Sequence, residues 1–443
     1  MNKQPKILIY GQPFNNCSGS GITLSNLFKG WPEEKIALAF VSWGYVNISY
    51  DICKTYYQIG KEEHYWKFPF YFVKQSFPNS GLISGTNAGG SSIKLSKTGI
   101  KQFLSDRVFN PFINWLGITH FNSRIKLSNG LKKWLIEFNP DILYIQVSTL
   151  EGIMFARQLI DFLKIPSAIH MMDDWPSTIS MYGPLKKIWK LKIDNEFKLL
   201  LDNVNLHMSI SDAMSKEYAK RYEKHFIPFH NPVDIANYNI PNNKKFSLED
   251  HFRILYIGRI GTANKLTINL FANLISQFSD DHLKIELNIF TSDIDSPEIR
   301  SITTLKNVIV RQAVAHKVIP SLLEEHDLLL LPLDFNEKGV RFAKYSIPTK
   351  ASEYMVSGVP VLVFAPEETA VAKFFSENDC GYCLTSQSQA EIIKAVRFLI
   401  SNEEYRKRIS RNALNLAKEK FDAEKVRERF HNVLANLVKD PRF

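Results

Sequence analysis

The stretch YSIPTKASEYMVSGVPVLV, residues 345–363, predicts a loop, a short helix and a buried strand in direct succession. Pro348 is tolerated in a first helical turn, where its ring presets φ and its missing N–H costs nothing. Gly358 suits the end of that helix, and Pro360 prevents its continuation. The apolar run that begins at Val361 is short enough for a buried strand. This is the unit from which a layered α/β fold is built.

The predicted helix offers an anion site at its N-terminus. Unpaired N–H groups and the helix dipole favour a phosphate there. Lys350 and Glu353 are three residues apart and therefore share one face of the helix. The Lys could meet an anion while the Glu accepts hydrogen bonds from sugar hydroxyls. The alternative is an ordinary loop–helix–strand unit with a solvated Lys and Glu.

This stretch resembles the donor-binding signature of bacterial family-four glycosyltransferases of the GT-B fold, a Pro-x-Lys-x-x-Glu-Tyr element that runs into x-x-Gly-x-Pro-Val. The resemblance implies that Glu353 binds the nucleotide ribose and that Pro348 and Lys350 belong to the donor site. Many members carry a second Glu eight residues earlier, where this chain has Tyr345. We therefore expect the sugar contacts to differ and to involve backbone groups around Ser346.

A second basic loop, LYIGRIGTANK at residues 255–265, follows another predicted strand. Loss of a nucleoside diphosphate builds negative charge on the leaving oxygen, and fixed cations aimed at that charge lower the barrier. Arg259 can grip a phosphate with two N–H groups, while Lys265 acts as a point charge. The loop resembles the strand–Gly-Arg–loop–Lys element of the same family, with Gly258 at the end of the strand. Lys265 comes one residue later than in that pattern, and a surface salt bridge is the alternative role for Arg259.

The length of the chain predicts two domains. It has 443 residues, which is too many for one core. Strand-like and helix-like segments alternate through both halves, which predicts an α/β protein with two doubly wound parallel sheets and ligands at the strand ends. By the resemblance this is the GT-B fold. We expect a first domain at 1–235 with an insertion at about 51–125, followed by a linker at 236–251. A second domain is expected at 252–422, and a terminal helix at 423–443 is expected to pack back on the first domain.

Composition excludes several classes of protein. Apolar residues make up 45% of the chain, which is a globular composition. No run approaches the roughly 18 apolar residues of a membrane helix, and the start of the chain resembles a first strand more than a signal peptide. We therefore expect a cytoplasmic protein. Residues 1–235 hold 27 Lys and Arg against 19 Asp and Glu, so most of the net charge of +10 lies there. That half is expected to face an anionic partner, unless the charge serves only solubility.

The first half offers acceptor-side candidates. Residues 167–176, SAIHMMDDWP, resemble the family strand that ends in His-Asp followed by Trp-Pro. Met172 stands where the His is usual, while His170 shares its strand face. Asp173 and Asp174 could take a proton from an acceptor hydroxyl, or could cap a helix beside a buried His.

Other segments receive weaker predictions. The loop at 11–21, with Gly19 and Gly21, resembles the Gly-rich loop that closes near donor and acceptor. The aromatic insertion is interpreted either as acceptor or membrane contacts or as a lid of local helices. Residues 336–344 are predicted to be a loop, and residues 311–316, which end in His316, to be scaffold.

The cysteines do not indicate a metal or redox site. Cys380 and Cys383 form a Cys-x-x-Cys pair, but no second pair or nearby His cluster completes a zinc site. We interpret both as packed thiols in a turn between a helix and a strand. No metal and no cofactor are expected, because the nucleotide sugar is a substrate.

The sequence as a whole predicts a glycosyltransferase that moves a hexose from a nucleotide sugar to a hydroxyl of a glycan or lipid-linked acceptor. The resemblance implies retention of configuration, no bound metal and a role in polysaccharide, O-antigen or capsule synthesis. The basic half could then lie peripherally on the inner membrane face. Two rivals remain: a nucleotide-sugar epimerase of the same fold, and a nucleic-acid-binding protein, although no nucleic-acid module is recognisable.

Overall fold

The computed structural model divides into two compact units: residues 1–229 with 427–443, and residues 230–426. The structure describes residues 4–16, 18–41, 48–68, 70, 77–83, 110–117, 122–178, 183–238, 246–278 and 283–439. Much of the expected insertion, at 69, 71–76, 84–109 and 118–121, lies outside the described residues, as do 239–245 of the expected linker. The boundaries of the units fall at 229/230 and 426/427, against 235 and 422 from the sequence.

The first unit is built on an eight-stranded sheet in the order β10-β9-β8-β7-β1-β2-β3-β5. All neighbours pair in parallel except β3 and β5, and a separate antiparallel pair joins β4 to β6. The strands are β1 (Ile7–Tyr10), β2 (Ile36–Val41), β3 (Thr55–Ile59), β4 (His64–Trp66), β5 (Gly81–Ile83), β6 (Ser123–Ile125), β7 (Ile142–Ile145), β8 (Ser167–Met171), β9 (Leu206–Ser209) and β10 (Phe226–Pro228).

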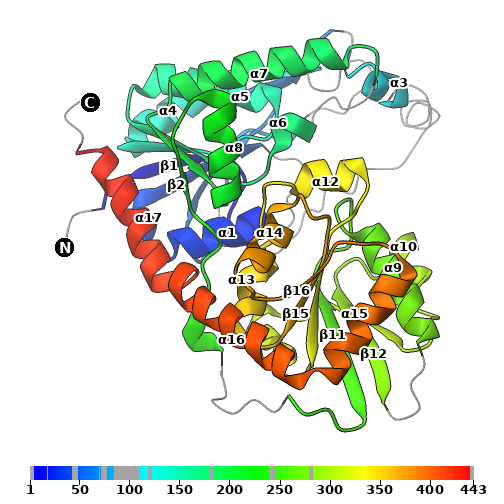
Figure 1. Cartoon of the computed structure of the whole chain (residues 1–443). Coiled ribbons are helices and arrows are strands. Elements are labelled where there is room, and N and C mark those ends of the chain that lie inside the picture. Colours follow the sequence, from blue (N-terminus) through cyan, green and yellow to red (C-terminus); the bar gives the residue numbers. More distant parts are fainter. Residues whose placement is uncertain are drawn as a thin grey trace. The chain divides into compact units, whose positions relative to one another are not determined.

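Helices connect and cover these strands (Figure 1). They are α1 (Gly19–Phe28), α3 (Asn110–Trp115), α4 (Asn129–Phe138), α5 (Leu150–Leu163), α6 (Trp175–Thr178), α7 (Lys186–Asp202) and α8 (Asp212–Tyr222). Ser211 caps the N-terminus of α8, because its hydroxyl accepts a hydrogen bond from the N–H of Met214 at 3.0 Å.

The last helix, α17 (Ala423–Leu437), completes the core of the first unit. It lies beside α1 in Figure 1. Phe430 is fully buried and packs edge-on against Phe28, Tyr144 and Phe229, with ring centroids 5.1–6.1 Å apart. Such aromatic pairs contribute beyond the area they bury. The N-terminal unit is therefore assembled from both ends of the chain.

The second unit has a six-stranded sheet in the order β13-β12-β11-β14-β15-β16, parallel throughout. Its strands are β11 (His251–Ile257), β12 (Lys284–Thr291), β13 (Val308–Gln312), β14 (Leu328–Pro332), β15 (Val361–Phe364) and β16 (Tyr382–Leu384). Its helices are α9 (Lys265–Gln277), α10 (Pro297–Arg300), α11 (Ile319–Glu324), α12 (Glu337–Ala343), α13 (Thr349–Val356), α14 (Ala370–Glu377), α15 (Gln389–Ser401) and α16 (Glu403–Lys420). Apolar clusters cover both faces of the sheet.

The fold prediction is confirmed, because each unit has the doubly wound topology of a mainly parallel sheet covered by helices. The prediction for one segment was wrong. Residues 336–344 were expected to be a loop, yet most of them form α12. Asn336 caps this helix by accepting a hydrogen bond from the N–H of Gly339 at 2.7 Å, and Arg341 pairs with Glu337 one turn away.

Candidate functional site

The basic loop of the second unit lies at the point where its strand order reverses. Strand β11 has β12 on one side and β14 on the other, and the chain leaves β11 at Gly258 and Arg259. In sheets of this kind, ligands bind at the carboxyl ends of the strands beside such a switch point. The sequence-predicted donor residues therefore stand where the topology favours a nucleotide.

Gly258 and Lys350 are packed directly against each other. Gly258 has φ of +135°, and a Cβ there would lie 2.0 Å from the Lys350 ammonium nitrogen, so only glycine fits. The ammonium lies 4.7 Å from the ring centroid of Tyr256 and 3.3 Å from its hydroxyl oxygen. Burial lowers the pKa of Lys350 to about 8, and the charge of Glu353 opposes this shift. A cation that is partly removed from water in this way interacts more strongly with a bound anion than a fully solvated cation does.

Glu353 is paired with His316, which no sequence motif indicated as a site residue. Its side chain is only 10% exposed, and its Oε1 lies 2.9 Å from Nε2 of His316, on the turn after β13. The hydrogen bond to Glu353 raises the pKa of His316, against the effect of burial. His316, expected to be scaffold, therefore orients the carboxylate. Only the tertiary fold brings together two residues 37 positions apart.

Arg259 and Lys265 flank a loop that is fixed from beneath. The Arg259 side chain is 72% exposed, with Nε 3.7 Å from Oδ2 of Asp293. Asn264 donates hydrogen bonds to the Tyr256 hydroxyl at 2.8 Å and to the Arg259 carbonyl at 3.1 Å. Lys265 is the first residue of α9. The loop backbone is thus held while the guanidinium remains accessible to a ligand.

Ser346 and Pro348 prepare the start of α13. Pro348 is the N-cap residue with φ of −55°, and no side chain caps the helix. The hydroxyl oxygen of Ser346 is buried without a hydrogen-bond partner in the described part of the chain. Open N–H groups and an unsatisfied hydroxyl both suit a bound anion. The structure thus brings Gly258, Lys350 and Tyr256 together, with α13 carrying Glu353 one turn further on.

Asp174, in the first unit, belongs to a buried network. Its carboxylate is 1% exposed and accepts two hydrogen bonds from Arg221, at 2.9 and 3.1 Å. The Tyr218 and Ser177 hydroxyls donate to it at 2.8 and 2.6 Å. With these four hydrogen bonds from three residues, the carboxylate holds α6 to α8. This network leaves it no geometry from which to take a proton from a substrate.

Asp173 and His170 differ from Asp174 in their surroundings. Asp173 lies two residues after the end of β8 and is half-buried. Burial raises the pKa of Asp173 to about 6, and the charge of Asp174 adds to the shift. His170 is buried, with Nδ1 2.6 Å from the Tyr144 hydroxyl, and burial lowers its pKa to about 3. The ring is therefore neutral at pH 7, and Asp173 is the better candidate base.

The loop before α1 is held by a residue that sequence reasoning missed. Asn15 is buried and accepts hydrogen bonds from the N–H and the hydroxyl of Ser18, at 2.8 and 2.9 Å. Ser18 in turn caps α1 by accepting from Gly21 N–H at 3.2 Å. A Cβ on Gly21 would lie 2.2 Å from the Asn15 amide nitrogen, so this loop requires glycine there. Gly19 is the first residue of α1.

Unsatisfied amides mark the switch point of the first sheet, between β1 and β7. Both polar atoms of the Gln146 side chain are buried without a partner in the described residues, as is Nε2 of Gln12. A Cβ on Gly11 would lie 2.8 Å from that of Gln146. Buried polar atoms are normally satisfied, so a ligand or water is expected here. Gln146 directly follows the apolar strand β7, and no sequence motif indicated a binding site there.

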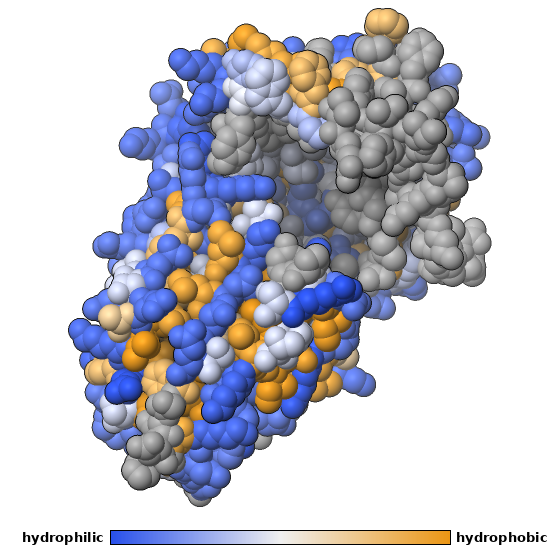
Figure 2. Space-filling model, turned by 90° about the vertical axis from the view of Figure 1, so that its right-hand side faces the viewer, coloured by the Kyte–Doolittle hydropathy of each residue, from blue (hydrophilic) through white to orange (hydrophobic). Residues whose placement is uncertain are grey.

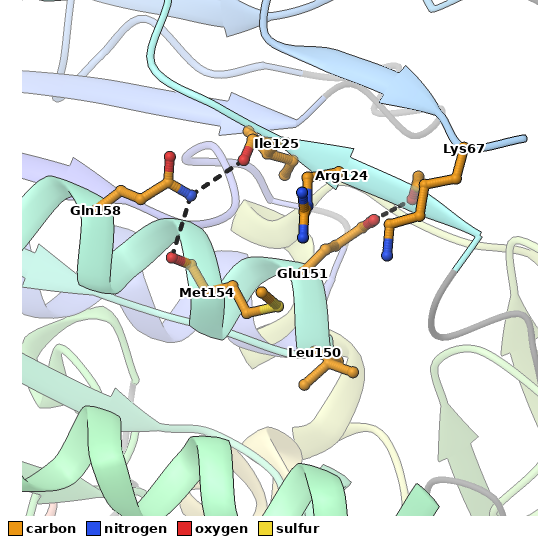
Figure 3. A pocket seen from close by; sticks show the side chains of 8 residues that line it. Lys67, Arg124, Ile125, Leu150, Glu151, Met154 and Gln158 are labelled. Carbon is orange, nitrogen blue, oxygen red and sulfur yellow. Dashed lines mark hydrogen bonds between the residues drawn. The ribbon is translucent and has the colours of Figure 1, made fainter.

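A small open pocket lies between β6 and the first turns of α5 (Figure 3). Lys67, Arg124 and Glu151 line it, and Ser123 donates a hydrogen bond to Glu151. His64 Nε2 lies 3.5 Å from the same carboxylate. Burial lowers the pKa of Lys67, and the nearby charges of Arg124 and Lys192 add to this effect. The charged residues of the lining are thus two cations and one carboxylate, among apolar and neutral polar side chains.

Within the described ranges, no group of three His, Cys, Asp or Glu side chains is arranged to hold a metal ion. Burial raises the pKa of Cys380 and Cys383 to about 12, and both thiols are free. Their sulfurs lie near backbone carbonyls, at 3.7 Å from Phe375 O and 3.4 Å from Ala372 O. This arrangement fits packed thiols.

Comparison with known proteins supports this view of the second unit. Residues 251–402 match the family model described as group 1 glycosyl transferases. The comparison with curated proteins found no match.

Solved structures resemble the whole chain. Anabaena HepE in complex with UDP and glucose is 12% identical, with 97% of this chain and 99% of that chain covered and a TM-score of 0.60. Sucrose-phosphate synthase from Thermosynechococcus elongatus is 10% identical, with 99% and 100% covered and a TM-score of 0.60. WaaG, a glycosyltransferase involved in lipopolysaccharide biosynthesis, is 13% identical, with 97% and 99% covered and a TM-score of 0.55.

The fold defined by the two units is that of the GT-B glycosyltransferases. The range that matches the group 1 glycosyl transferase model, residues 251–402, contains the candidate donor residues. These findings support an enzyme that transfers a sugar.

Proposed function

We propose that the protein transfers a hexose from a nucleotide sugar to a hydroxyl group, with retention of configuration as in family-four enzymes. The observation that carries this proposal is the cation-lined switch point of the second unit, where Lys350 packs against Gly258 and Tyr256 beside the exposed Arg259. The match of residues 251–402 to group 1 glycosyl transferases supports it. HepE, which has the same fold, binds UDP and glucose, so a nucleotide-sugar donor is consistent with this architecture.

The proposed roles follow from charge and position. Arg259, Lys265 and the first N–H groups of α13 would hold the diphosphate as negative charge grows on its oxygen. Lys350 supplies a desolvated cation, whose attraction to a phosphate is stronger than it would be in water. Glu353, fixed by His316, would accept hydrogen bonds from the ribose hydroxyls. These groups are already positioned, so little reorganisation is needed at the transition state.

On the acceptor side, Asp173 would receive the proton of the acceptor hydroxyl. With a pKa raised to about 6 by burial and by Asp174, it is ionised at pH 7 and still basic enough to assist. Gly19, Gly21 and His170 would shape the surrounding surface. No metal or cofactor is proposed, since cationic side chains are available to neutralise the diphosphate. A chelator should therefore leave turnover unchanged, and an absolute need for a divalent ion would contradict this part of the proposal.

The acceptor is proposed to be a glycan or a lipid-linked saccharide. WaaG, which shares the fold, acts in lipopolysaccharide biosynthesis, so such acceptors are compatible with this architecture. The protein would work peripherally on the cytoplasmic face of the inner membrane, without nucleic acid as a partner. No helix of the described residues has both the length and the apolar character to span a bilayer.

Calorimetric titration with a panel of nucleoside diphosphates tests the donor site. Wild type should bind one of them, while Glu353→Ala should bind it roughly tenfold more weakly, because a ribose hydrogen bond to a charged group is lost. Glu377→Ala, an exposed residue on α14, is the control and should bind as wild type does. Absence of binding by wild type would overturn the proposal. A donor-only reaction that yields an isomer would instead favour an epimerase.

A further inference from the structure

Helix α7 carries apolar side chains on two opposite faces. Its inner face is buried in the core through Ile193, Phe197, Leu200 and Leu201. On the outer face, Ile188 and Leu191 are 60% and 65% exposed, and Leu199 is 45% exposed. Spacings of 3 and 11 residues place these three on one side of a helix. A surface helix normally presents polar residues there, so this second stripe needs a reason.

Helix α3 extends the same apolar surface. The indole N–H of Trp189, on α7, donates to the Leu116 carbonyl just after α3 at 3.0 Å. Gly183, with φ of +96°, approaches the Trp115 carbonyl so closely that a Cβ could not fit. Phe112 and Trp115 are 54% and 56% exposed. In Figure 2, orange side chains gather along the upper rim, where Figure 1 places α7 and α3.

Lysines are concentrated in the first half of α7. The segment 183–193 contains Lys186, Lys187, Lys190 and Lys192, and the acidic residues Asp194 and Glu196 follow it. Single exposed apolar residues are normal, but four large ones on two adjoining helices form a patch of the kind that marks an interaction site. Bulky apolar side chains on a lysine-rich helix are typical of segments that lie in the headgroup region of a bilayer.

We propose that this α3–α7 surface, made of Phe112, Trp115, Ile188 and Leu191 with the four lysines, docks onto an anionic lipid bilayer. The positive charge of this surface determines which partner it fits. A second copy of this basic chain would bring lysine against lysine, whereas acidic headgroups offset all four. The inference rests on the proposed peripheral location and names the surface responsible for it.

Co-sedimentation of the full chain with vesicles tests the proposal. Vesicles of phosphatidylcholine with phosphatidylglycerol should bind wild type, and vesicles of phosphatidylcholine alone should bind it much more weakly. The double variant Ile188→Ser with Leu191→Ser should lower the partition coefficient at least about tenfold, because it removes the inserted apolar groups. Replacement of Lys186, Lys187 and Lys190 by Gln should lower it roughly fivefold per lysine and remove the salt dependence.

Ile136→Ser on α4 is the matched control, since that residue is 67% exposed and lies outside the α3–α7 surface. It should bind vesicles as wild type does. Equal binding by the double variant, or no binding by wild type, would overturn the inference. Loss of a wild-type dimer in the double variant, without any vesicle binding, would assign the surface to a second copy instead. Nucleoside diphosphate binding is measured in parallel, so failure at the membrane is distinguishable from failure of the proposed transferase activity.

Discussion

The two sheets have related topology but opposite chemistry at their carboxyl edges. In the second unit that edge carries an exposed Arg259 and a half-buried Lys350 beside a glycine turn. In the first unit the carboxylate of Asp174 is closed off by Arg221, Tyr218 and Ser177. One edge is prepared for an anion, whereas much of the other is satisfied internally. Repetition of a fold therefore does not repeat a function, since side chains at the strand ends define the site.

The largest effect, on the free energy of unfolding, should come from Asp174 at the carboxyl edge of the first sheet. Asp174→Ala leaves the Arg221 charge and the Tyr218 hydroxyl without their partner, and it should lower the free energy of unfolding of the first unit by about 3–5 kcal/mol. Asp173→Ala is the matched variant. It should cost less than about 1 kcal/mol, because burial already opposes that charge. Urea unfolding followed by circular dichroism measures both. Equal losses would remove the distinction between the two carboxylates.

The next effect concerns the open edge. Arg259→Ala should lower turnover by about two orders of magnitude, as loss of one preorganised donor usually does. Its free energy of unfolding should change by less than about 0.5 kcal/mol, because the side chain is 72% exposed. Arg311→Ala, an exposed cation on β13, is the control and should keep wild-type turnover. Unchanged turnover in the Arg259 variant would exclude it from the site.

The smallest effect separates binding from folding at Lys350. Lys350→Met keeps the packing on Gly258 and Tyr256 but removes the charge, so nucleoside diphosphate affinity should fall roughly tenfold. In wild type, affinity should weaken as pH rises through about 8, where Lys350 loses its proton. The unliganded protein should show the reverse. The folded-state pKa lies below the ordinary 10.5, so the unfolded chain holds more protons and stability rises with pH from about 8 towards 10.5.

Calorimetry and urea unfolding across that pH range check both trends. Lys373→Met on α14 is the exposed control and should change neither quantity. A variant at Lys350 that loses stability at pH 7 while keeping its affinity would make Lys350 a structural residue and would weaken the contrast between the two edges.

The sequence predicted most of what local pattern determines. Strand β15 begins at Val361 as predicted, because this short apolar run is covered on both faces of the sheet. Helix α12 was missed, because its support is a cap and an ion pair instead of a long apolar period. Gly258 and Arg259 could be selected because their chemistry is carried by a single loop.

Roles that depend on distant partners could not be predicted. His316 meets Glu353 across 37 residues, and Asp174 meets Arg221 across 47. Neither pairing follows from periodicity or spacing. Glu353 and Asp174 could both be selected as candidates from the sequence. Only the tertiary structure shows that Glu353 is oriented by His316 at the candidate site, whereas the hydrogen bonds of Asp174 are used within the core.

Helix α17 has a consequence for biosynthesis. The chain crosses between the units at 229/230 and again at 426/427. Beside these crossings Val233 and Phe421 are joined by a backbone hydrogen bond of 2.8 Å. Phe430, which packs against Phe28, Tyr144 and Phe229, is translated only after the whole of the second unit. The core of the first unit therefore stays incomplete during translation until a side chain more than 400 residues behind Phe28 has emerged.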